Sequence, residues 1–212
     1  MIENIFWLGH ASFRIESTPR IYIDPWHLPA ECSPADAILI SHEHYDHCSI
    51  SDIRKIATPD THIIASVEAA KVLENDLNEW SIKVLRPWQT LNIGRANIKA
   101  VPAYTFDNYH PATRDDLGFL IALNHHDIYY AGDTDLVPEI RRMGCDIAIL
   151  PVSGKEGLMT IEHARDLVEV MRPSYTVPSH YGVAEGGTRL DAQTLETAVQ
   201  GLSKFVWLDA AV

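Results

Sequence analysis

The chain has 212 residues, a formal net charge of −12 and a hydrophobic fraction of 46%. This length suffices to bury a core without disulfides, and the composition is that of a globular protein rather than a disordered one. An acidic surface repels phosphate backbones, so no nucleic-acid partner is expected. The cysteines number 3, which favours a reducing compartment; with no evident signal peptide or membrane span, we expect a cytoplasmic location.

Short runs of β-branched and aromatic residues predict many strands, and apolar residues at helical spacing predict fewer helices. Ser66 and Thr160 are suitable helix N-caps, and His125 and His126 occupy a predicted hairpin turn. The predicted strands are 4–9, 12–16, 20–25, 36–42, 61–66, 81–85, 89–94, 96–103, 117–124, 127–133, 145–152, 175–180 and 204–209. The predicted helices are 49–57, 66–77, 135–144, 160–173 and 191–202. This pattern indicates a layered α/β domain with helices covering the sheet faces.

The stretch "ILISHEHYDHCS" places His42, His44, Asp46 and His47 directly after an apolar strand. Polar groups crowded at the end of a buried strand are costly without partners, and a divalent cation binds imidazole nitrogen and carboxylate oxygen readily. In an extended chain His42 and His44 face the same way, so they can bind one ion. If a helix begins near Asp46, that residue and His47 turn toward a second ion, and one segment then serves two metals.

Together with "AGDTD" and "PSHYG", the motif "HEHYDH" resembles the metallo-β-lactamase superfamily over nearly the whole chain. More narrowly, "GHASFRIE", "IYIDPW" and "VPAYTFDNYHP" resemble its branch of small metal-dependent hydrolases, which includes ascorbate-phosphate lactonase-like proteins. The resemblance implies an αββα sandwich formed by a single domain, residues 1–212. It also implies metals at the sheet edges between the two halves.

The resemblance implies a ligand set as well. His42 and His44 would bind the first metal; Asp46, His47 and His180 would bind the second; and Asp133 would bridge both. The family often places a further ligand soon after the strand 96–103, where this chain has Tyr104. We therefore expect His110 to be the third ligand of the first metal, as in the small-hydrolase branch.

Two other polar residues have roles that the sequence leaves open. Asp24 resembles the family aspartate that orients the metal-binding loop, but a turn residue before Pro25 is an equal alternative. His10, in "GHASF", either lines the pocket, where it contacts substrate or donates a proton, or is a turn histidine.

Two bound cations lower the pKa of a shared water and polarise the bond under attack. The expected reaction is therefore attack of a metal-bridged hydroxide on an ester, lactone or phosphodiester of a small-molecule substrate. Asp46 would orient the nucleophile and take its proton, and His10 could stabilise the leaving oxygen. The mixed nitrogen and oxygen donors suit zinc first, with manganese or iron as alternatives.

Three other functions remain as alternatives. A non-enzymatic metal-binding or regulatory module is not excluded by the ligand set. Another alternative is a di-iron redox protein. The motif of that branch of the superfamily resembles H-x-E-x-D-H, with glutamate at the third position, where this chain has His44. A nuclease would carry an added domain or arm, which this sequence does not show.

Overall fold

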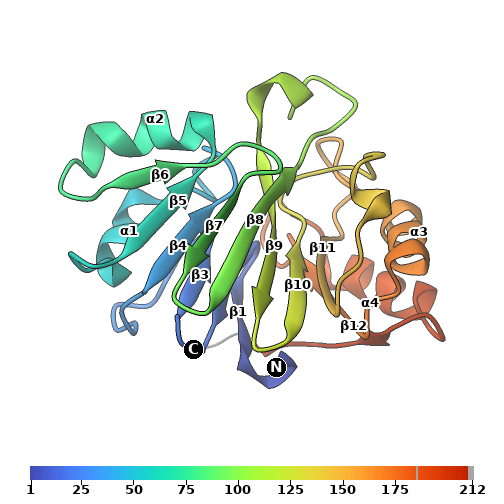
Figure 1. Ribbon diagram of the computed structural model, residues 1–212. Helices are drawn as coiled ribbons and strands as arrows, with labels where there is room; N and C mark the ends of the chain where they lie inside the picture. Colours follow the sequence, from blue (N-terminus) through green and yellow to red (C-terminus); the bar gives the residue numbers. More distant parts are fainter. Residues whose placement is uncertain (185, 210–212) are drawn as a thin grey trace.

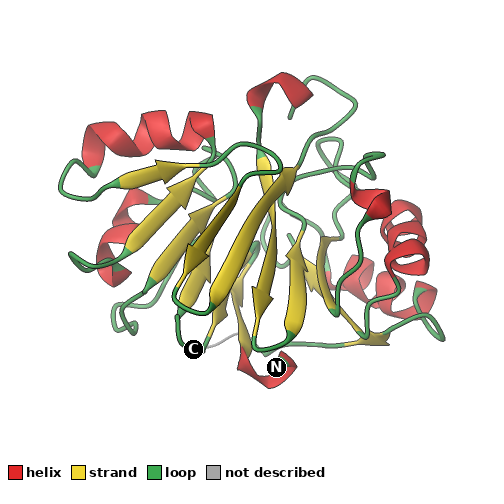
Figure 2. Cartoon of the chain, in the orientation of Figure 1, coloured by secondary structure: helices red, strands yellow, loops and turns green. Residues whose placement is uncertain are grey.

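Two β-sheets pack face to face, with helices on their outer faces (Figure 1). The structure is a computed structural model that describes residues 1–184 and 186–209. Its layers are those of an αββα sandwich, and the predicted fold class is confirmed (Figure 2). The predicted single domain, 1–212, includes residues 185 and 210–212, which lie outside the described residues.

The first sheet contains 6 strands in the order β1-β2-β3-β4-β5-β6. Strands β1, β2 and β3 pair antiparallel, whereas β3, β4, β5 and β6 pair parallel, so β3 and β4 end at the same sheet edge. The strands are β1 (Ile5–Gly9), β2 (Ser12–Ile15), β3 (Ile21–Ile23), β4 (Ala37–Ile40), β5 (His62–Ala65) and β6 (Ile82–Val84).

The second sheet contains 7 strands in the order β13-β12-β11-β10-β9-β8-β7. Strands β7 to β10 form an antiparallel meander, and β10 to β13 are parallel. The strands are β7 (Thr90–Ile93), β8 (Ala96–Pro102), β9 (Leu117–Leu123), β10 (His126–Tyr130), β11 (Ile147–Pro151), β12 (Tyr175–Ser179) and β13 (Lys204–Phe205).

Three apolar layers hold the sandwich together. The central layer joins the inner faces of both sheets, with Phe13 from β2 and Phe119 from β9 fully buried. Helices α1 and α2 cover the outer face of the first sheet, and α3 and α4 cover that of the second (Figure 1). The helices are α1 (Ile50–Ile56), α2 (Val67–Asp76), α3 (Ile161–Met171) and α4 (Arg189–Ala198), with 3-10 turns at η1 (Ile2–Asn4), η2 (Ala112–Arg114) and η3 (Ile140–Arg142).

The predicted N-caps are confirmed: Ser66 and Thr160 accept hydrogen bonds from the backbone of the first turns of α2 and α3. Thr188 and Asp191 form a capping box, so α4 begins before the predicted 191–202. No helix within residues 1–184 and 186–209 has the length and apolar character needed to cross a membrane.

Three local predictions are wrong. The predicted helix 135–144 is reduced to η3, because Pro138 lacks the N–H that a helix interior needs. The predicted strand 204–209 is shorter than expected, because β13 comprises only Lys204–Phe205. The β9–β10 turn is centred on Asn124 and His125, both with positive φ, so His126 already belongs to β10.

Candidate metal centre

The predicted ligands gather at one edge of the sandwich, where strands of both sheets end. The segment His42–His47 follows β4 of the first sheet. Asp133 and His180 follow β10 and β12 of the second sheet, and His110 lies in the loop between β8 and β9. The carboxyl ends of parallel strands meet at one edge of a sheet, so residues distant in sequence converge there.

The segment after β4 forms a turn rather than the start of a helix. The His44 carbonyl accepts hydrogen bonds from the backbone N–H groups of His47 and Cys48, at 2.9 and 2.8 Å. Helix α1 begins only at Ile50, with Ser49 as its N-cap. The sequence suggests that a helix beginning near Asp46 turns Asp46 and His47 away from His42 and His44. The structure makes this change of direction with a turn instead.

A first group of donors comprises His42, His44 and His110, with one nitrogen of each ring within 4.8 Å of the others. The His42 and His44 ring centroids are 4.7 Å apart, and His110 lies 4.8 Å from each. The Nε2 atoms of His42 and His110 are buried and have no hydrogen-bond partner among the described residues. Tyr104, by contrast, directs its hydroxyl to Glu139 at 3.0 Å.

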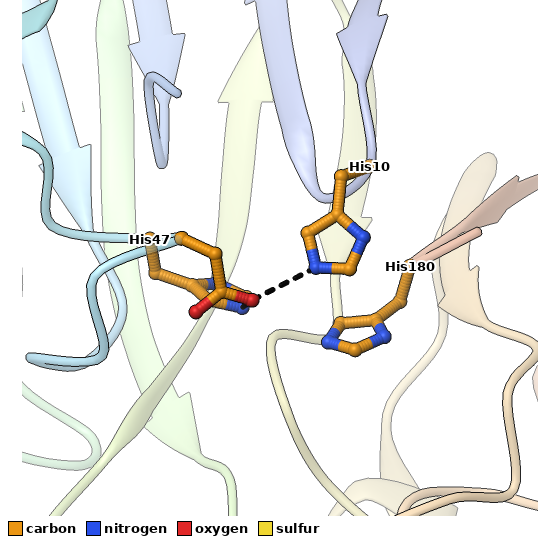
Figure 3. A group of neighbouring side chains, drawn as sticks. His10, His47 and His180 are labelled. Carbon is orange, nitrogen blue, oxygen red and sulfur yellow. Dashed lines mark hydrogen bonds and ion pairs between the residues drawn. The ribbon is translucent and has the colours of Figure 1, made fainter. Parts of the chain in front are cut away.

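A second group comprises Asp46, His47 and His180, joined by His10 from the turn between β1 and β2. His10 Nε2 lies 2.9 Å from Asp46 Oδ2, the contact marked by the dashed line in Figure 3. The rings of His10 and His180 lie side by side, tilted by 52°, with centroids 4.0 Å apart (Figure 3). His47 Nε2 is buried and has no hydrogen-bond partner among the described residues.

Asp133 lies between the two groups. Its carboxylate is 3.5 Å from His47 Nε2, 3.8 Å from His110 Nε2 and 3.1 Å from His180 Nε2. Gly132, with φ of +66°, precedes it, and a Cβ at that position would lie 2.6 Å from the Leu117 carbonyl oxygen. The glycine therefore allows the chain after β10 to turn closely past β9 and present Asp133 to both groups.

Hydrogen bonds fix the orientation of three imidazole rings. His47 Nδ1 lies 2.8 Å from Asp24, His110 Nδ1 lies 3.2 Å from Asp116, and His42 Nδ1 lies 2.9 Å from Ser41 Oγ. Metal-binding histidines commonly have such partners on the second ring nitrogen, which leaves Nε2 for the ion. Of the two roles considered for Asp24, its contact with His47 favours that of a carboxylate that orients a metal ligand.

Sequence reasoning missed Ser41, Asp116 and Tyr130, the last of which donates a hydrogen bond from its hydroxyl to Asp24 at 2.7 Å. Ser41 adjoins the histidine motif and Asp116 immediately precedes β9, so position next to a strand end was the available signal.

Burial and mutual charge set the protonation of the cluster without a metal. Burial lowers the pKa of His42 well below its usual value, so this imidazole is neutral. Burial would also lower the pKa of His47, but the negative charges of Asp133 and Asp24 outweigh it and raise the pKa to about 10. Burial opposes ionisation of Asp133, yet His180 and His47 hold its pKa well below the ordinary value. Anionic carboxylates and inward-facing imidazole nitrogens fit a site for divalent cations.

A pocket of about 400 Å³ opens over these donors. It is lined by His44, Asp46 and Asp133 of the cluster, together with Glu43, Tyr45, Tyr109 and Glu156. The pocket gives a small molecule access to the donor groups.

Comparisons with known proteins agree with this geometry. Residues 4–180 match the family model described as a beta-lactamase superfamily domain. A protein named metal-dependent hydrolase from Thermoplasma acidophilum is 30% identical over 84% of this chain and 82% of its own length. One of the same name from Aeropyrum pernix is 31% identical over 85% of this chain and 83% of its own.

A solved structure is also similar. The crystal structure of a protein from Parabacteroides distasonis, described as a candidate metal-dependent hydrolase, superposes with a TM-score of 0.83. It is 30% identical in sequence, and the match covers 97% of this chain and 93% of that one.

Proposed function

The chain belongs to the metallo-β-lactamase superfamily, and from this premise we propose that it is a metal-dependent hydrolase that cleaves an ester, lactone or phosphodiester of a small molecule with two divalent ions. The names of its relatives support the hydrolase class. One observation carries the dinuclear reading: the Asp133 carboxylate lies between two groups of donors, near His110 of one and His47 and His180 of the other.

The donor set supports zinc, with manganese or iron as alternatives, because nitrogen and oxygen donors are mixed and no thiolate is present. His42, His44 and His110 would hold the first ion, Asp46, His47 and His180 the second, and Asp133 both. When bound, such ions supply a water of lowered pKa and polarise the bond under attack.

Asp46 would orient the attacking water, and His10 would position Asp46. Burial opposes ionisation of Asp46, but the hydrogen bond from His10 and the charge of His47 lower its pKa to about 2. Asp46 therefore stays anionic and orients the water by accepting its hydrogen bond. Burial lowers the pKa of His10, so its ring is neutral near pH 7. The neutral His10 ring donates its Nε2–H to Asp46 over 2.9 Å and so holds the carboxylate in position.

The test measures metal content and turnover on the same protein sample. Elemental analysis should find two ions per chain, and an aryl ester, a lactone and a phosphodiester should be assayed in parallel. The His42→Ala and Asp133→Ala variants should lose both an ion and turnover, whereas His62→Ala, which removes an exposed histidine at the start of β5, should lose neither.

Other outcomes would decide against parts of the proposal. One ion per chain would contradict the bridging role of Asp133 or the ligand role of His110. No ion after reconstitution with zinc, manganese or iron would overturn the proposal. Two ions without turnover on any of these substrates would favour the metal-binding or regulatory module instead.

A further inference from the structure

The outer wall of the pocket consists of Glu43, Tyr45, Tyr109 and Glu156, which lie beyond the metal donors. These four side chains are the part of the pocket that a substituent of the substrate meets while its reacting group faces the donors. Tyr45 and Glu43 come from the turn after β4, whereas Tyr109 and Glu156 come from the two loops that follow β8 and β11. Glu43, Tyr45 and Tyr109 therefore adjoin candidate ligands in the sequence, whereas Glu156 comes from a loop that carries none of them.

The four wall residues include two carboxylates and no cation. Arg114 pairs with both Glu43 and Asp116, so the acidic character of the wall rests on Glu156. Lys155 donates to the carbonyl oxygens of Ala184 and Gly186. Proteins usually recognise phosphate or carboxylate groups with arginine, lysine or backbone N–H groups. The outer wall offers none of these side chains to an anionic substituent.

Two aromatic rings lie exposed beside these carboxylates. Tyr45 is 62% exposed and Tyr109 is 45% exposed, although large apolar side chains are mostly buried in this fold. Tyr109 meets the His44 ring edge-on at 5.7 Å, and Tyr45 meets Trp26 edge-on at 6.2 Å. Both rings are thus positioned by neighbours of the cluster, and aromatic faces attract cations.

The two loops meet at the pocket, where Tyr109 and Glu156 both form part of the wall. Both side chains are exposed, so the wall presents a carboxylate and an aromatic ring together. A carboxylate next to aromatic rings is the arrangement that recognises an alkylammonium group.

We infer that the substrate carries a positively charged substituent of the alkylammonium type, which lies against Tyr45, Tyr109 and Glu156 while its ester or lactone bond faces the metal donors. This inference rests on the proposed function and narrows it, because a phosphodiester brings a negative charge to a pocket whose outer wall is acidic.

Matched substrates test the inference directly. Three 4-nitrophenyl esters share one leaving group and differ only at the end of the acyl chain, which is a methyl, a carboxylate or a trimethylammonium group. With the zinc-loaded protein, kcat/KM should be roughly tenfold higher for the trimethylammonium ester than for the carboxylate ester. An equal or reversed order would overturn the inference.

Two variants locate the preference. Glu156→Gln keeps the shape of the side chain but removes its charge, so the ratio of cationic to anionic kcat/KM should fall about threefold or more. Glu169→Gln removes an exposed charge in the last turn of α3 and should leave that ratio unchanged. The same fall in both variants would mean that the preference comes from net charge and not from the pocket.

Binding separates this inference from the hydrolase proposal. Calorimetry with the zinc-loaded protein should show tighter binding of phenyltrimethylammonium than of benzenesulfonate, and Glu156→Gln should narrow the difference. If this holds while no ester is hydrolysed, the charge preference stands and the proposed reaction fails. If neither ion binds, or the sulfonate binds more tightly, the inference is overturned whether or not an ester is hydrolysed.

Discussion

The Tyr130 hydroxyl donates a hydrogen bond to Asp24 Oδ2 over 2.7 Å, linking β10 of the second sheet to the end of β3 in the first. Asp24 is fully buried and also accepts from Ser41 and His47. A side chain from one sheet therefore positions the carboxylate that orients a candidate ligand on the other.

Replacing Tyr130 by Phe should destabilise the protein by about 1–2 kcal/mol, because Asp24 loses a donor in a dry environment. The adjacent Tyr129 is a matched control, since its buried hydroxyl has no hydrogen-bond partner among the described residues. Tyr129→Phe should be neutral or stabilising. Urea unfolding of both variants measures the difference, and equal effects would contradict the assigned role of the Tyr130 hydroxyl.

Metal binding should release at least one proton per chain near pH 8. The negative charges around His47 outweigh its burial and raise its pKa to about 10 without a metal, and a bound cation displaces that proton. Apparent metal affinity should therefore rise about tenfold per pH unit below that pKa. Calorimetry in two buffers of different ionisation enthalpy measures the release, and Asp24→Asn should reduce it.

The same shift predicts how the stability of the metal-free protein depends on pH. The pKa of His47 is raised on folding from 6.5 to about 10, so its contribution is complete below pH 6.5. That contribution declines as the pH rises and is lost through pH 10. Unfolding of chelator-treated protein at pH 6 and pH 10 tests this, and higher stability at pH 10 would contradict it.

Asp52 should stabilise the loop that follows Asp24. It is buried and accepts from the backbone of His27 and Leu28 at 3.0 and 3.1 Å, and from Lys55 at 2.8 Å. Burial opposes its ionisation, but the Lys55 and Ser49 hydrogen bonds lower its pKa, so its contribution exists above about pH 4 and is lost as the pH falls through the lowered value.

Asp52→Asn should cost about 1–3 kcal/mol at pH 7 and less at pH 3. The exposed Asp60 provides the control, since Asp60→Asn should change stability little at either pH. Thermal unfolding at the two pH values decides, and a loss that is independent of pH would mean that the charge of Asp52 is not responsible.

Gly132→Ala should damage both the fold and the metal centre. Its Cβ would meet the Leu117 carbonyl oxygen at 2.6 Å on a backbone with φ of +66°, and the adjustment would move Asp133. We expect a loss of about 2–4 kcal/mol together with reduced metal content. Gly144→Ala, at a position with no atom within 4 Å of the new Cβ, should be nearly neutral in both measurements.

Much of the fold was predictable because strand-length apolar runs and capping residues are local signals. Ser66 and Thr160 act where local chemistry places them. The segment 135–144 failed because the Asp135 carboxylate caps Leu136 and Pro138 interrupts the helical hydrogen bonds, while apolar spacing alone favoured a helix. The predicted hairpin turn was misplaced by one residue, because Asn124 rather than His126 adopts the left-handed conformation that the turn requires.

The candidate ligands could be named because metal-binding residues follow strand ends in short motifs. Their supporting contacts could not, because Tyr130 reaches Asp24 only after the two sheets have packed. His110 shows the same limit: Asp116 holds its ring at 3.2 Å, a relationship set by the path of the loop between β8 and β9. The outer wall of the pocket likewise depends on loops whose course no periodicity encodes.

The donors at this edge come from both sheets: His42, His44, Asp46 and His47 from the first, and His110, Asp133 and His180 from the second. Ions held by such a set would act as cross-links between the two halves of the sandwich, comparable to a disulfide that closes a long loop. Removal of the ions by a chelator should thus loosen the contact between the two sheets at this edge, while the central apolar layer keeps the sheets together elsewhere. Both the stability of the protein and its activity would then depend on the concentration of free metal around it.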